Sequence, residues 1–126
     1  LFEDEESFYY VMGRIAEGKE PWLDVAVRLA PSADAHPGEE LASALARALG
    51  NAPVAVLSRS FEPITIGFIC SGPGLEEDEK WYQQALERAL AAVSGIKSVV
   101  LAAKRDACVK LLTEAKAGLA TKEHAE

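Results

Sequence analysis

The strongest constraint on the fold of this 126-residue chain is a pattern that occurs twice: two alternating apolar segments, an amphipathic segment, then a glycine. Alternation is typical of a strand with one buried face, and apolar residues three and four apart are typical of a helix. Gly50 and Gly95 follow the two amphipathic segments, where glycine often ends a helix. The pattern predicts, in order, strands over 8–16 and 22–30, a helix over 37–49, strands over 54–60 and 64–70, and a helix over 75–94.

The clearest strand pattern lies in segment 22–30, where apolar residues occupy every second position. One predicted face of this strand carries Leu23, Val25, Val27 and Leu29, and the other carries Trp22, Asp24, Ala26 and Arg28. Because successive side chains of a strand point to opposite faces, the first set is expected in the core. Segment 64–70 alternates in the same way, with Ile64, Ile66, Phe68 and Cys70 on its predicted buried face.

The chain after Gly95 has two interpretations. Residues 96–103 are rich enough in β-branched side chains for a strand, followed by a helix from Asp106 to Ala117. The alternative is a single helix over 98–117. We prefer strand then helix, because Val99, Val100 and Leu101 are consecutive and lack helical spacing.

Together these elements predict an α+β fold. An antiparallel sheet of about four to five strands would carry two or three helices, mainly on one face, in the βαββαβ order of ferredoxin-like domains. One additional strand would precede that order and one helix would follow it. A doubled ββα unit is the competing topology. The expected organisation is an acidic, frayed N-terminus (1–7), a single domain (8–118) and a loose C-terminal tail (119–126).

Composition excludes several classes of function. Hydrophobic residues make up 49% of the chain and charged residues 26%, as in ordinary globular domains, and no apolar run is long enough to span a membrane. The net charge of −7 disfavours nucleic acid, because an acidic surface repels the phosphate backbone. The expected partner is another protein or a second copy of the chain. No membrane partner is expected.

The segment Cys70–Gly74 is the main candidate for chemistry. A thiol before a helix start can be activated by the helix dipole, and Cys70 and Ser71, with Asp24 and His36, are the alternative catalytic residues. The four acids at 76–79 argue against this role, because negative charge raises a thiol pKa and repels anions. We expect Cys70 and Cys108 to be small buried thiols in a reducing cytoplasm.

No metal or cofactor is expected. The chain has two histidines and no zinc-ligand spacing. The acids at 76–79 are consecutive, and consecutive helical residues point about 100° apart, so they cannot converge on one ion. A charged helix N-terminus explains them better.

The predicted open face of the sheet is the main candidate for binding. Its interface residues are Tyr10, Trp22, Asp24 and Arg28, with an aromatic pair typical of protein interfaces. The sequence therefore favours a non-enzymatic, acidic protein-binding or regulatory module that acts through an open sheet face or edge. A homodimer is one form that this module could take. The alternative is a small enzyme or small-molecule sensor with its site near the Cys70–Gly74 loop.

Overall fold

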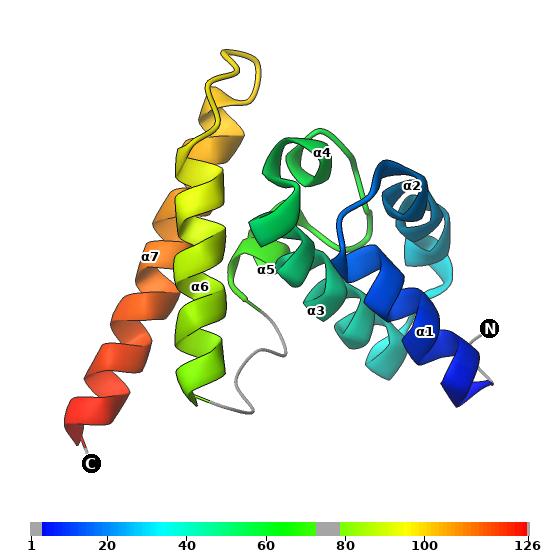
Figure 1. The fold of residues 1–126 in the computed structure, drawn as a ribbon, viewed down its shortest axis with the longest axis horizontal. Coiled ribbons are helices and arrows are strands. Elements are labelled where there is room, and N and C mark those ends of the chain that lie inside the picture. The colour runs from blue at the N-terminus through cyan, green and yellow to red at the C-terminus, as the bar shows by residue number, and fades with distance from the viewer. Residues whose placement is uncertain (1–3, 73–78, 126) are drawn as a thin grey trace.

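The computed structural model of the chain describes residues 4–72 and 79–125, without the side chains of residues 79 and 120–125. Its regular structure is helical (Figure 1). The helices are α1 (Glu5–Ala16), α2 (Glu20–Leu29), the short 3₁₀-helix η1 (Ala30–Ser32), α3 (Ala35–Asn51), α4 (Pro53–Leu57), α5 (Ile66–Cys70), α6 (Glu79–Ser94) and α7 (Ala102–Ala125).

The helices are arranged around α3. Helices α6 and α7 lie side by side as a hairpin on one side of α3, and α1 and α2 lie on the other (Figure 1). Helix α5 packs against both α3 and α7. Between Leu41 and Leu49 every residue of α3 except Arg47 is buried, as expected for a helix surrounded by others. The core is therefore built around α3.

The α+β, ferredoxin-like prediction is wrong. The described residues form no strand, and their β-pairing is limited to one isolated bridge between Phe61 and Ile64. Helices α1 and α2 replace the first predicted pair of strands, at 8–16 and 22–30. Helices α4 and α5 replace parts of the second pair, at 54–60 and 64–70. The predicted strand at 96–103 is a loop and the beginning of α7.

Helical spacing decides the first pair. In α1 the buried residues Phe8, Met12 and Ile15 are four and three apart. In α2 the buried residues are Leu23 and Ala26, and the alternating Val25 and Val27 are only partly buried. Ala26 makes this helical spacing hard to recognise in the sequence, because alanine fits the exposed face of a strand and the buried face of a helix equally well. Alternation over 22–30 was thus a coincidence of spacing.

The second pair shows the same error more directly. Strand alternation placed Phe68 in the core and Ile69 outside, but Phe68 is 46% exposed and Ile69 is fully buried. Helix α5 instead turns Ile69 and Cys70 inward together, which adjacent residues of a strand cannot do. Thr65 caps this helix by accepting a hydrogen bond from the backbone N–H of Phe68.

Two predicted helices are present. The predicted segment 37–49 lies within α3, which continues through Gly50 to Asn51. Helix α6 contains the described part of the predicted segment 75–94, and its start at 75–78 lies outside the described residues. Helix α7 resembles the alternative, a single helix at 98–117, more than the preferred strand and helix. The expected domain limits, residues 8 and 118, both fall inside helices.

Cys70 and Cys108 form a disulfide that links α5 to α7. Both residues are buried, as the predicted buried thiols would be, but they are oxidised.

In the part of the chain that is described, no helix combines the length and the apolarity needed to cross a membrane.

Candidate functional site

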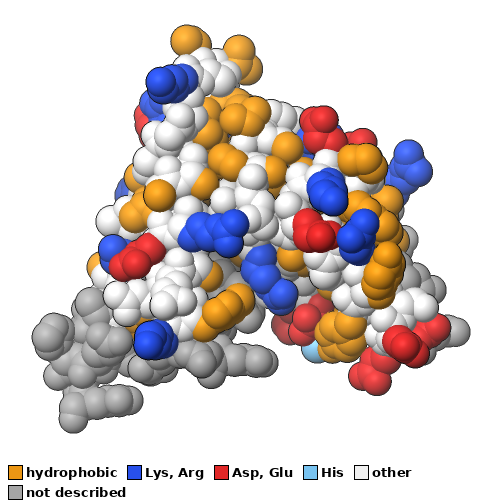
Figure 2. Space-filling view, viewed as in Figure 1, with side chains coloured by type: hydrophobic (Ala, Val, Ile, Leu, Met, Phe, Trp, Pro, Cys, Tyr) orange, Lys and Arg blue, Asp and Glu red, His pale blue; other side chains and the backbone are white. Residues whose placement is uncertain are grey.

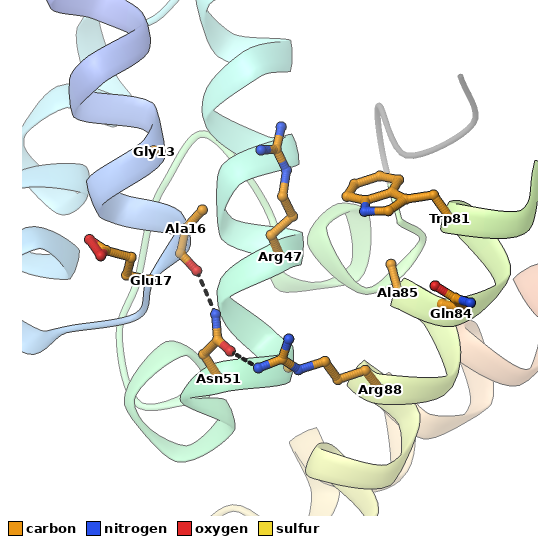
Figure 3. A pocket seen from close by; sticks show the side chains of 10 residues that line it. Gly13, Ala16, Glu17, Arg47, Asn51, Trp81, Gln84, Ala85 and Arg88 are labelled. Atoms are coloured by element: carbon orange, nitrogen blue, oxygen red, sulfur yellow. Dashed lines mark hydrogen bonds between the residues drawn. The ribbon is translucent and has the colours of Figure 1, made fainter. Parts of the chain in front are cut away.

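A cavity of about 440 Å³ opens between α1, α3 and α6 (Figure 3). This volume falls within the range of small-molecule sites, roughly 300–1,000 Å³. Helix α1 contributes Gly13 and Ala16, and Glu17 follows it as its C-cap. Helix α3 contributes Arg47, Gly50 and Asn51, and helix α6 contributes Trp81, Gln84, Ala85 and Arg88. We call this cavity the arginine pocket.

Helix α3 supplies Arg47, the exposed exception in its buried segment. The guanidinium donates a 3.4 Å hydrogen bond to Ser43 Oγ, one helical turn earlier. Its central carbon also lies 5.9 Å from the centre of the Trp81 ring, within range of a cation–π interaction. Figure 3 shows Arg47 and Trp81 facing each other across the space between α3 and α6.

Helix α6 has two faces with different roles. Its buried face packs on the core and comprises Tyr82, Leu86, Ala89 and Val93. Its pocket face comprises Trp81, Gln84, Ala85 and Arg88, at the spacing that places residues on one side of a helix. Helical spacing therefore lets one face of α6 pack on the core while another face carries the aromatic and cationic groups of the pocket.

A hydrogen-bond relay connects the three helices that line the pocket. Arg88 of α6 donates to the side-chain oxygen of Asn51 on α3. The Asn51 amide donates in turn to the backbone oxygen of Ala16 in α1, at 2.9 Å (Figure 3). The relay holds Arg88 across the pocket at the end of α3.

Gly50 makes room for Arg88. A Cβ atom at residue 50 would lie 3.1 Å from Cγ and 3.3 Å from Cδ of Arg88, which is tighter than ordinary contact. The absence of a side chain therefore lets the Arg88 stem lie close against α3. Gly13, on the opposite wall, has open space where its Cβ would be.

The pocket is cationic although the chain is acidic, with a net charge of −7. Basic side chains gather in the middle of the face shown in Figure 2, over the junction of α6 with the α1–α3 side. Arg47 and Arg88 have no carboxylate partner among the described residues. Glu17 also lines the pocket, but its carboxylate forms an ion pair with Arg14 at 3.2 Å. The chemistry suits an anionic group beside an aromatic surface.

The candidate catalytic residues lie outside this pocket. Cys70 is in the disulfide, so it carries no free thiol. The Ser71 hydroxyl donates to the backbone oxygen of Phe68 at the end of α5. His36 is in the first turn of α3, with Nε2 3.7 Å from Glu40. Cys70 and Ser71 are neighbours in the chain, but within the described residues no hydrogen bond or ion pair joins either of them to Asp24 or His36.

The predicted interface residues lie on α1 and α2, not on a sheet. Tyr10 is 61% exposed, and its ring contacts Trp22 edge to face at 6.3 Å. Asp24 accepts a 3.0 Å hydrogen bond from Arg59 Nε instead of pairing with Arg28. Arg28 is exposed on α2. The structure thus brings Tyr10 and Trp22 into contact, whereas no ion pair within the described residues joins Asp24 to Arg28.

Sequence reasoning missed Arg47, Asn51 and Arg88, although a signal was present. Arg47 is the one charged residue in the apolar segment 41–49, and Asn51 follows it by four positions on the same side of the helix. Such a pair on a core helix indicates a place where the core opens. The described residues contain no group of three or more His, Cys, Asp or Glu side chains able to hold a metal ion.

Comparison with known protein families, with curated proteins and with solved structures finds no match to this chain. A functional assignment must therefore come from the pocket itself.

Proposed function

We propose that this chain is a non-catalytic binding protein that captures a small molecule bearing a negatively charged group in the arginine pocket. The observation that carries the proposal is the convergence of Arg47 and Arg88 on one cavity, without a carboxylate partner among the described residues. Guanidinium groups bind carboxylates and phosphates through charge-assisted hydrogen bonds. The relay through Asn51 holds one of them in place before a ligand arrives, which lowers the entropy cost of binding.

The lining supports binding more than catalysis. Its polar side chains are arginines, amides and one glutamate, without a nucleophile next to a base. His36 lies eleven residues before Arg47 on α3, which corresponds to about 16 Å along the helix axis at the usual rise per residue. The oxidised Cys70 offers no thiolate.

Isothermal titration calorimetry at low salt tests the proposal with three acids: octanoate, naphthalene-2-carboxylate and 2-naphthyl phosphate. We expect the wild type to bind at least one of them. The Arg47→Gln/Arg88→Gln double variant should bind it about tenfold more weakly or worse, because charge-assisted hydrogen bonds are lost.

Arg28→Gln is the matched control, because it removes the same charge from an exposed site on α2 away from the pocket. It should leave the affinity within about twofold. The proposal fails if the wild type binds none of the acids, or if the double variant binds as the wild type does.

A second candidate function is protein association through Tyr10 and Trp22, as the sequence predicted, but on helices α1 and α2. It is supported by the exposure of Tyr10 and its contact with the Trp22 ring, since paired aromatic side chains are common at interface centres. We propose that the partner is a second copy of the chain.

Native mass spectrometry tests this second candidate. A dimer that Tyr10→Ala and Trp22→Ala each weaken would support it. Phe68→Ala is the control, because Phe68 is an exposed aromatic residue on a different helix. A monomeric wild type, or variants that associate as the wild type does, would contradict it.

The disulfide also bears on location. Thiols are kept reduced in the cytosol, so a buried disulfide supports an oxidising compartment. This weighs against the cytoplasmic location that the sequence predicted from unpaired cysteines.

A further inference from the structure

We propose that the ligand of the arginine pocket is a planar aromatic acid, with its ring against Trp81 and its acidic group held by Arg47 and Arg88. This inference rests on the proposed function and names the class of molecule that the pocket binds. Two independent parts of the lining, one for each end of the ligand, carry it.

The acidic end is specified by the two arginines. One N–H group of the Arg88 guanidinium donates a hydrogen bond to Asn51, and its further N–H groups can bind an oxyanion. Arg47 approaches from α3 on the other side of the pocket (Figure 3). Among the described residues, Arg47 forms a long hydrogen bond to Ser43 and lies beside the Trp81 ring, and an arriving anion can replace both contacts at little cost.

The ring end is specified by Trp81. The indole is 43% exposed and is one of the pocket-lining residues. Aromatic rings stack on or meet each other edge to face more favourably than saturated groups of the same area do. Because Arg47 and Trp81 face each other, a ring against Trp81 places a directly attached acidic group within reach of Arg47.

The walls favour a flat molecule. Gly13, Ala16 and Ala85 contribute little or no side chain, so two sides of the cavity are close to the helix backbones. Small residues of this kind leave a smooth wall that suits a flat ring. The volume of about 440 Å³ is at the small end of the usual range of ligand sites.

Calorimetry with matched ligands tests the class, using the intact chain. Naphthalene-2-carboxylate and 2-naphthyl phosphate carry both features, octanoate carries only the acid, and 2-naphthalenemethanol carries only the ring. We expect at least one naphthyl acid to bind about tenfold more tightly than both octanoate and the alcohol. Comparison of the two naphthyl acids identifies the preferred acidic group.

The outcomes separate this inference from the proposed function. If octanoate binds as tightly as the naphthyl acids, the aromatic class is wrong but anion capture stands. If the alcohol binds as tightly as the acids, both are wrong, because the arginines then contribute nothing. Both also fail if none of the four molecules binds.

Two variants locate the ring. Trp81→Leu should weaken binding of the naphthyl acid about tenfold and leave any octanoate binding unchanged. Phe68→Leu is its control, because Phe68 is 46% exposed but lies on α5 outside the pocket. Equal losses in the two variants would overturn the placement of the ring.

Gly13→Leu provides a test that does not depend on removing a contact. A side chain at residue 13 extends into open space, and leucine also favours helix. This variant should fold and lose the naphthyl acid, whereas Gly13→Ala should retain it. Wild-type affinity in the folded Gly13→Leu variant would place the ligand elsewhere and overturn the proposal.

Discussion

At the scale of single residues, the pocket depends on two glycines that play different parts. Gly50 lies against the Arg88 side chain, so it positions a binding group. Gly13 faces open space in the last turn of α1, so it leaves the cavity empty. A glycine inside a helix costs stability relative to alanine. Gly13 is therefore better explained by the pocket than by the helix.

Gly13→Ala should stabilise the protein by about 0.5–1 kcal/mol, because alanine has less backbone freedom to lose and nothing lies near the new Cβ. Urea unfolding followed by circular dichroism measures the change. A loss of stability would show that this position is more crowded than the structure indicates.

Asp4, the N-cap of α1, has a carboxyl group whose pKa is shifted in the folded protein. The hydrogen bond from the Ser7 hydroxyl, at 2.9 Å, and a second from the Ser7 backbone N–H lower the pKa of the Asp4 carboxyl below its ordinary value of 3.8. Because the folded pKa is depressed, this cap stabilises the helix fully above pH 3.8. Its contribution is lost as the pH falls through the lower, folded value.

We therefore expect the Asp4 carboxyl to titrate below pH 3.8 in NMR spectra, and the Ser7 amide signal to shift with it. Asp4→Asn keeps a good N-cap but removes the titration, so the Ser7 shift should disappear. A midpoint at or above 3.8 would contradict the capping geometry.

At the scale of elements, the disulfide holds one of the shortest α-helices of the described chain. Helix α5 has five residues, far fewer than an isolated helix needs to persist in water. The Cys70–Cys108 bond ties its end to α7, and its residues Ile69 and Cys70 are buried. Packing and the covalent bond therefore maintain α5, not the propensity of its sequence.

Cys70→Ala/Cys108→Ala should lower the free energy of unfolding by about 4 kcal/mol, from the loop entropy of a 38-residue separation. Guanidinium unfolding measures it. Dithiothreitol should lower the wild type to the stability of the variant and leave the variant unchanged. A difference below about 1 kcal/mol would mean that the bond contributes little.

At the scale of the whole molecule, α3 is the element that packs against the largest number of other helices: α1, α4, α5 and α6. The α6–α7 hairpin, α1 and α5 all pack around it (Figure 1). Alanines make this close approach possible, and Ala42, Ala44, Ala46 and Ala48 are all buried. The buried side of a helix that is enclosed by its neighbours cannot relax away from an enlarged side chain.

Ala48→Leu should therefore destabilise the protein by about 1–3 kcal/mol through overpacking. Ala107→Leu is the matched control on the exposed side of α7, where the same change should cost little. Thermal unfolding of the two variants compares them directly. Equal stabilities would show that α3 is not enclosed.

The sequence by itself determined helices α3 and α6, because the apolar residues in these two segments fit helical spacing and do not fit strand alternation. Leu41, Leu45 and Ala48 in α3, and Tyr82, Leu86, Ala89 and Val93 in α6, follow helical spacing and are buried. The burial of Cys70 was also predicted, but from a strand alternation that helix α5 contradicts. These features depend on the periodicity of a single segment, which the chain displays without its neighbours.

Only the tertiary structure decided the rest. Segment 22–30 fits a strand by alternation and a helix by Leu23 and Ala26, and packing on α1 selected the helix. The disulfide requires α5 and α7 to meet, and the arginine pocket requires α1, α3 and α6 to meet. Contacts between segments far apart in the chain create these features, and no local pattern records such contacts.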